Sequence, residues 1–263
     1  MKMTVANVAP KRVKEEHGVM AKKVSHRHFA RVPNGYARLT FLGELTPKAH
    51  DLLHYVVNQV ALTGNIDTWV HFEAKQLAEI LSPGSTRVAN RSYDALWSAI
   101  KQVTKLEIEH EYIDPNNNHL MRTWFVPMDG VKWDTEDNTY KLHLSESFRN
   151  YLTTAMQEGW TKVLLLELFT LPSVVEKNLY LVASSLVPLT IPRARFISYK
   201  ALRHKMGWKG AYYQDPRRLR IKTGAVLKKI NQRVGRMFHI ADWNEHGIIF
   251  DDATARREVN GGN

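Results

Sequence analysis

Apolar residues recur at helical spacing in the last third of the chain. The apolar or part-apolar positions are one, three or four residues apart, and they are Leu219, Thr223, Val226, Leu227, Ile230 and Val234. This spacing places them on one side of a helix. The other side carries Arg217, Ile221, Gly224, Ala225, Lys228 and Gln232, with Arg218, Arg220, Lys222 and Lys229 flanking it. We therefore predict a helix from about Asp215 to Arg233 with one packed side and one basic side.

An earlier group of elements shows the order typical of a winged helix. The pattern predicts a helix from Thr46-Pro47 to about Val60, a strand at 69–72, a short helix from Glu73 and a longer helix from about Thr86 to Lys105. Strict alternation over 106–112 and a second run over 120–127 then predict a hairpin. A strand at 140–144 and a helix capped by Ser145 end this group. We predict a first winged-helix domain over 35–171.

The same order of elements recurs in the second half of the chain. The predicted elements are a helix from Pro172 to Pro188, a short helix after Phe196-Ile197, the basic helix, and a hairpin at 236–242 and 248–250. Displaced by 125 residues, Phe72, Leu77 and Leu81 fall on Ile197, Leu202 and Met206. Displaced by 127 residues, Ala99, Ile100 and Val103 fall on Val226, Leu227 and Ile230. The sequence thus predicts an α+β fold of tandem winged-helix domains, with the second over 172–252.

The terminal segments complete this organisation. Residues 1–34 are rich in Lys, Arg and His and poor in apolar positions, and we interpret them as a disordered basic arm. Residues 253–263 are interpreted as a C-terminal tail.

The basic side chains are concentrated where the second domain is predicted. The chain has a formal net charge of +11, and residues 193–236 contain fourteen Lys or Arg against one acid, Asp215. Residues 32–192 are net acidic, so the positive charge is divided between the basic N-terminal segment and one folded region and does not coat the whole chain. A polyanion, nucleic acid or an acidic membrane surface, is the expected partner.

Composition excludes several classes of protein. The chain has no cysteine, which excludes disulfides and thiolate metal sites and suits a reducing cytoplasm. No apolar run reaches the ~18 residues of a membrane span. The basic N-terminus lacks the apolar core of a signal peptide.

The histidines and carboxylates do not form a recognisable catalytic or metal-binding motif. His50 and His54 lie one helical turn apart, but no Glu follows His50 and no third ligand is evident. His26 and His28 lack the apolar flanks of the paired histidines in rolling-circle nicking enzymes. There is no Gly-x-x-x-x-Gly-Lys-Ser/Thr loop. We expect no metal, no cofactor and no enzymatic activity.

Duplex DNA fits the basic helix best. The major groove admits one helix, and small residues such as Gly224 and Ala225 let a helix backbone approach closely. The side chains expected to contact base edges are Arg217, Arg218, Ile221, Lys228 and Gln232. The side chains expected to contact the DNA backbone are Arg193, Arg195, Lys200, Arg203, Lys205, Lys209, Tyr212, Tyr213, Arg220, Lys222, Lys229 and Arg233, and more weakly Arg87, Asn90, Arg91 and Lys101 in the first domain. Tyr212 and Tyr213 could equally pack beneath their loop.

Several segments resemble the iteron-binding plasmid replication initiators, whose chains carry two winged-helix domains. The resemblance covers about 40–250, and its segments are 45–53, Tyr180-Leu181, 197–203 with Met206-Gly207-Trp208, 226–231 and 247–250. The resemblance implies binding to double-stranded origin repeats, help in opening the origin, dimerisation through the first domain and recruitment of host replication proteins, a helicase and an initiator. It also implies a location in the bacterial cytoplasm, in association with nucleoid or plasmid DNA. Two alternatives remain: a winged-helix transcriptional regulator without an initiator role and, less favoured, a rolling-circle nicking enzyme.

Overall fold

Both helices and strands occur along the chain in the computed structural model, which describes residues 19–20, 29–33, 40–42, 45–63, 69–81, 90–113, 116–157, 160–187 and 194–253. The helices are α1 (Pro47–Thr63), α2 (Ala74–Leu81), α3 (Asn90–Thr104), α4 (Glu146–Gln157), α5 (Leu165–Thr170), α6 (Val174–Leu186), α7 (Tyr199–Met206), the short 3-10 helix η2 (Ala211–Gln214) and α8 (Pro216–Asn231). The strands are β1 (Val19–Met20), β2 (Phe29–Pro33), β3 (Thr40–Leu42), β4 (Val70–Glu73), β5 (Glu107–Ile113), β6 (Leu120–Phe125), β7 (Met128–Asp134), β8 (Thr139–Leu144), β9 (Trp160–Leu164), β10 (Arg195–Ser198), β11 (Phe238–Trp243) and β12 (Gly247–Asp252).

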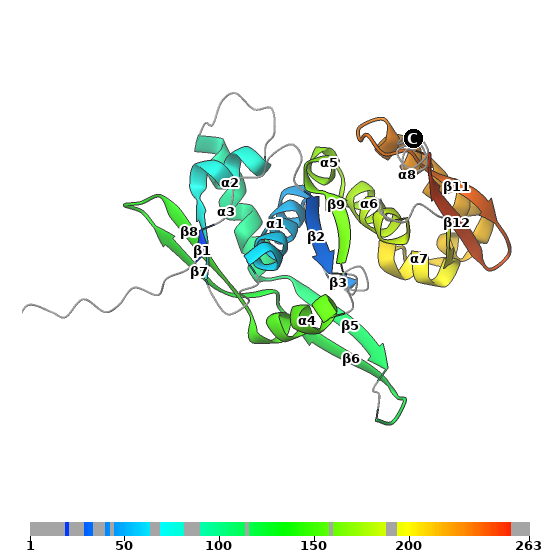
Figure 1. Cartoon of the computed structure of the whole chain (residues 1–263), viewed down its shortest axis with the longest axis horizontal. Coiled ribbons are helices and arrows are strands. Elements are labelled where there is room, and N and C mark those ends of the chain that lie inside the picture. The colour runs from blue at the N-terminus through cyan, green and yellow to red at the C-terminus, as the bar shows by residue number, and fades with distance from the viewer. Residues whose placement is uncertain are drawn as a thin grey trace, which may run out of the picture.

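Two sheets at opposite ends of the molecule follow one pattern (Figure 1). One has the order β1-β4-β8-β7 and the other the order β10-β12-β11. In each, the strand that precedes a pair of helices pairs antiparallel with the second strand of a hairpin, with Phe72 opposite Tyr140 and Ile197 opposite Ile248. The helices α2 and α7 both have eight residues and are displaced by the expected 125 positions. The predicted correspondence of these helices is confirmed.

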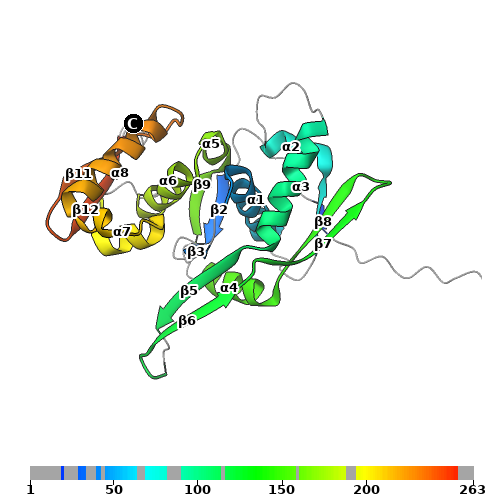
Figure 2. The same cartoon turned by 180° about the vertical axis from the view of Figure 1, so that it is seen from behind.

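The predicted hairpin at 106–112 and 120–127 is confirmed, because β5 pairs antiparallel with β6, but its expected place as the hairpin of the first winged helix is wrong. These two strands form a separate sheet with β3, in the order β3-β5-β6. The hairpin that pairs with β4 is β7–β8. Alternating polarity identifies a strand but carries no information on its partner, which a long-range contact decides. Both views show β5–β6 projecting from the rest of the molecule (Figures 1 and 2).

Part of the segment predicted as a disordered arm is paired into sheets. β1 pairs parallel with β4, and β2 pairs antiparallel with β9, from Phe29 opposite Leu164 to Pro33 opposite Trp160. The prediction of disorder over 1–34 is therefore wrong for these two strands. Backbone hydrogen bonds supply the pairing, and they are available to a basic segment as to any other. The other residues of 1–34, and the predicted tail from 254, lie outside the described residues.

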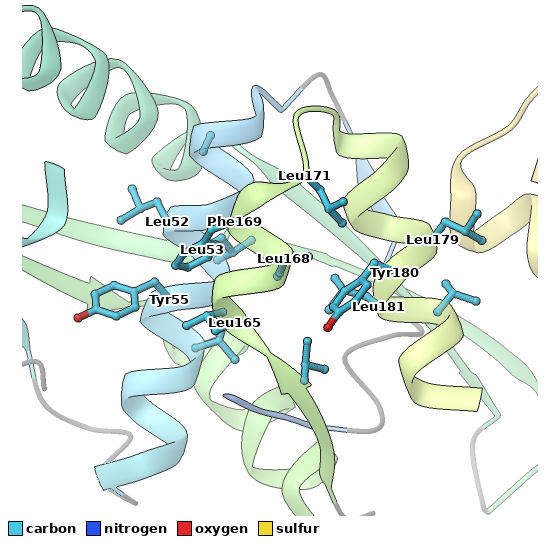
Figure 3. Close-up of a cluster of buried hydrophobic side chains, with 14 of the residues drawn as sticks. Leu52, Leu53, Tyr55, Leu165, Leu168, Phe169, Leu171, Leu179, Tyr180 and Leu181 are labelled. Carbon is cyan, nitrogen blue, oxygen red and sulfur yellow. The ribbon is translucent and has the colours of Figure 1, made fainter. Parts of the chain in front are cut away.

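The core runs through the middle of the molecule. Every residue of α1 from Ala49 to Ala61 is buried. Leu52 and Leu53 of α1 pack with α5 and α6 in a cluster of buried side chains (Figure 3). The same cluster continues into the apolar sides of α7 and α8. α6 also contacts α8 directly, so the basic helix rests on the central core. No helix in the described part of the chain is long and apolar enough to cross a membrane.

A buried polar seam joins α1 to α6. Lys177 Nζ lies 2.7 Å from Asp51 Oδ1 and donates to the Leu168 carbonyl oxygen at 2.8 Å. His50 Nε2 donates to Asn178 Oδ1 at 2.9 Å, and His54 Nδ1 donates to the His50 carbonyl oxygen at 2.7 Å. Burial lowers the pKa of His54 to about 4, and burial beside His54 lowers the pKa of His50 well below its usual value. Both rings are thus neutral members of the packed interior at pH 7.

Candidate nucleic-acid interface

The helix α8 begins at a defined cap and packs on the predicted side. Asp215 Oδ1 accepts the Arg217 backbone N–H at 2.9 Å, and Pro216 occupies the first helical position. The apolar positions are buried, with exposed fractions of 0% for Leu219 and 0% for Ile230. Thr223 is buried too and donates its hydroxyl to the Leu219 carbonyl oxygen at 2.8 Å. The predicted packed side of the helix is confirmed.

The side chains proposed to contact base edges share the opposite, exposed side of α8. They are all exposed, and they are Arg217, Arg218, Ile221, Lys228 and Gln232. Gly224 lies among them, and a Cβ atom built on it would have no heavy atom within 4 Å. Ala225 beside it is exposed. The centre of this side is therefore low and open, with long cationic side chains around it.

Aromatic residues position the start of this side. The Arg218 guanidinium lies 5.0 Å from the Tyr212 ring centroid, and its Nε lies 3.4 Å from Asp215 Oδ2. Tyr212 is exposed, whereas Tyr213 stacks on Trp208 with a centroid separation of 5.4 Å. Of the two possibilities left open for these tyrosines, Tyr213 packs beneath the loop and Tyr212 lies at the surface.

A basic hollow lies beside α7 and η2. It has a volume of about 600 Å³, and its lining includes Lys200, Arg203 and Lys209. Gly207 and Gly210, with φ of 62° and 94°, shape its rim in backbone conformations that other residues rarely adopt. The other cations predicted nearby divide by exposure: Arg195 is exposed and Lys205 is partly exposed. Three of the predicted phosphate-contacting side chains are thus brought to one concave surface.

The hairpin β11–β12 adds residues that the sequence pattern did not single out. Trp243 is 55% exposed at the end of β11, and the Arg220 guanidinium lies over its ring, 3.6 Å from the centroid. Asn244 Oδ1 accepts the backbone N–H groups of His246 and Gly247, which fixes the turn that follows. In the sequence, Trp243 could have been identified only by its position next to the predicted turn. Arg220 and Trp243 together connect the helix to its hairpin.

Other predicted contact residues differ in their accessibility. Lys222 and Lys229 are exposed, while Arg233 Nη1 lies 3.7 Å from Glu176 Oε2 and donates to the Lys229 carbonyl oxygen. Arg193 lies outside the described residues.

Arg236, counted among the fourteen cations, is a correction to the charge argument because it is only 2% exposed. Its Nε donates to Asp252 Oδ2 at 2.7 Å and its Nη1 to Ser184 Oγ at 3.2 Å. This cation pairs inside the fold and is not part of the surface.

The first group of elements presents a different surface at α3. Lys101 Nζ lies 5.2 Å from the Trp97 ring centroid, and Trp97 neighbours Trp133 and Tyr140 at centroid separations of 6.5 and 6.3 Å. Arg87 and the side chains of Asn90 and Arg91 lie outside the described residues. Of the contact residues predicted on this helix, Lys101 is the one whose side chain the structure describes.

Comparisons with known proteins identify a family and similar solved structures. The family model described as "Initiator Replication protein, WH1" matches residues 37–184. Among solved structures, the chain is similar to the Pi initiator protein in complex with iteron DNA, with a TM-score of 0.60, 13% identity, and coverage of 87% of this chain and 98% of that chain. It is more distantly similar to domains 2 and 3 of RctB, with a TM-score of 0.40, 9% identity, and coverage of 90% and 94%. No curated protein matches the sequence. The family match and the Pi structure establish an α+β winged-helix fold.

Proposed function

The chain belongs to the family of initiator replication proteins, and from this premise we propose that it initiates plasmid replication by binding double-stranded iteron repeats and helping to open the origin. The observation that carries the proposal is α8, whose exposed side combines cations with an open centre at Gly224 while its other side is anchored in the core. The Pi initiator, of similar fold, was crystallised with iteron DNA.

We propose two winged-helix domains in tandem, over 35–171 and 172–252. The shared order of β4, α2, α3 and β7–β8 with β10, α7, α8 and β11–β12 supports this division. The second domain is the main DNA-binding one, and the first serves dimerisation and weaker backbone contact.

The proposed binding mode places α8 in a major groove. Arg217, Arg218, Lys228 and Gln232 reach base edges, where Arg pairs with guanine and Gln with adenine. The basic hollow beside α7 and the Arg220–Trp243 pair of the hairpin hold flanking phosphates. If six to ten cations contact phosphates, affinity falls by about 10³–10⁵ between 50 and 200 mM salt. This contribution is the same for any duplex, so sequence preference depends on the few residues that reach bases.

Family membership also supports the proposed partners. The protein acts in the bacterial cytoplasm on plasmid DNA, forms a homodimer, and recruits a host helicase and initiator. It requires no metal or cofactor and makes or breaks no covalent bond itself.

Selection of bound fragments from a random duplex DNA pool by the full-length protein tests the proposal. Recovery of one short motif that supports higher-order complexes as tandem direct repeats is the expected result. A palindrome that maps to promoters, with no effect of the protein on plasmid maintenance, would instead favour a transcriptional regulator. Recovery of no motif would refute sequence-specific binding.

A further inference from the structure

A branched aliphatic side chain stands in the middle of the basic side of α8. Ile221 is 59% exposed. It precedes the fully buried Ile230 by nine residues, which at about 100° per residue places it directly opposite the centre of the packed side. The other large hydrophobic side chains that are exposed in the described part of the chain are aromatic or methionine. A single exposed apolar residue is ordinary on a protein surface. The neighbours of Ile221 are what make it informative.

Those neighbours leave the Ile221 side chain accessible to a large ligand. Gly224 and Ala225, three and four residues further on, lie on the same side of the helix. A Cβ at Gly224 would meet no heavy atom within 4 Å, so no side chain fills the space at Gly224 beside Ile221. Arg217 and Lys228, one turn before and two turns after, are exposed. An apolar spot is thus surrounded by groups that attract a polyanion.

We propose that Ile221 recognises thymine by packing against its C5 methyl group in the major groove. The inference rests on the proposed function, since it assumes that α8 faces duplex DNA. In the major groove, base edges present hydrogen-bond donors, acceptors and one apolar group, which is the thymine methyl. The Ile221 side chain can neither donate nor accept a hydrogen bond, so this methyl is its chemical complement. Gly224 and Ala225 let the helix backbone come close enough for the contact.

The contact is testable by removing only the methyl group. The probe is the duplex recovered from the random pool, with each thymine replaced in turn by deoxyuridine, which pairs identically with adenine. At one thymine, the replacement should weaken binding by the wild-type protein about four-fold, the effect of one buried methyl group. Ile221→Ala should bind the unmodified duplex at least as weakly as this and should no longer distinguish thymine from deoxyuridine at that position.

A matched variant separates this contact from general attraction. Lys229→Ala, on the same helix and also exposed, should bind every duplex more weakly and still distinguish thymine from deoxyuridine. Since Ile221 is exposed, its alanine variant should keep the wild-type unfolding midpoint. Identical responses of wild type and Ile221→Ala to every thymine replacement would overturn the inference while salt-dependent duplex binding persisted. Loss of duplex binding by the wild-type protein itself would instead overturn the proposed function and this inference with it.

Discussion

Substitution of Gly224 is expected to move fold stability and DNA binding in opposite directions. Glycine inside a helix is less favourable than alanine by about 0.5–1 kcal/mol. The position has room for a side chain, because no heavy atom lies within 4 Å of a Cβ built there. Gly224→Ala should therefore raise the free energy of unfolding by about 0.5–1 kcal/mol.

The proposed docking of α8 predicts the reverse for DNA. Gly224 is partly exposed and lies between Ile221 and Lys228 in the sequence, on the side of the helix that would approach the groove. A leucine there overfills the contact, which costs about 1–3 kcal/mol and corresponds to a loss of affinity of about 5- to 150-fold. Gly224→Ala should lose less affinity than Gly224→Leu, because its methyl group is smaller.

Two measurements check this pair of effects. Urea unfolding followed by circular dichroism gives the stability, and fluorescence anisotropy with the selected duplex gives the affinity. Thr153→Leu, at an exposed position of α4 remote from α8, is the matched control and should leave affinity unchanged. If Gly224→Leu bound the selected duplex as tightly as wild type, α8 could not lie in the groove through this side.

Three further outcomes follow from the same surface and from the buried seam. Arg217→Ala should relax preference at one base pair by ~1–3 kcal/mol, whereas Lys200→Ala should weaken binding to all sequences alike; equal effects across a panel of duplexes would contradict these roles. Trp243→Ala should weaken binding to all duplexes a few-fold, because it removes the ring beneath the Arg220 guanidinium and with it a cation–π contact of about 0.5–1 kcal/mol. Trp243→Phe should restore much of the lost affinity. Because the pKa of His54 is lowered in the fold to about 4, protonation favours the unfolded chain. Between pH 6.5 and pH 4 the free energy of unfolding should therefore fall by up to about 3 kcal/mol as His54 becomes protonated in the unfolded chain. Denaturant unfolding of His54→Gln across this pH range should not show this part of the decrease.

Elements and hairpins set by local pattern could be predicted, and the partners of strands that are distant in the sequence could not. The apolar spacing of α8 and the proline at its start determine its position and its packed side almost alone. β2 lies within the basic N-terminal segment, and it is a strand because β9 offers a partner more than a hundred residues away. β7 was missed for the same reason, since it became part of a sheet through β8 and β4. The pairing of strands that are far apart in the sequence is decided by how the whole core assembles, so a local pattern cannot predict it.

In the candidate site, the sequence could predict only in part which charged side chains lie at the surface. The pattern of polar positions was enough to place Arg217, Ile221 and Lys228 on one exposed side. It could not show that Arg236 turns inward to Asp252, because a buried cation and a surface cation look alike in a sequence. The stacking of Arg220 on Trp243 depends on how the hairpin folds back on the helix, which no local pattern specifies.

Comparison of α3 with α8 supports the proposal that α8, and not α3, lies in the groove. Displaced by 127 residues, the buried Ala99, Ile100 and Val103 match the buried Val226, Leu227 and Ile230, so both helices pack through the same side. On the exposed side, Trp97 stands where α8 has Gly224, and Trp97 lies against Trp133 of the neighbouring hairpin. Where α8 has Ile221, α3 has the acidic Asp94. A bulky ring and a carboxylate at the centre of α3 oppose close approach to a polyanion, whereas the same scaffold with Gly224 and Ile221 permits it.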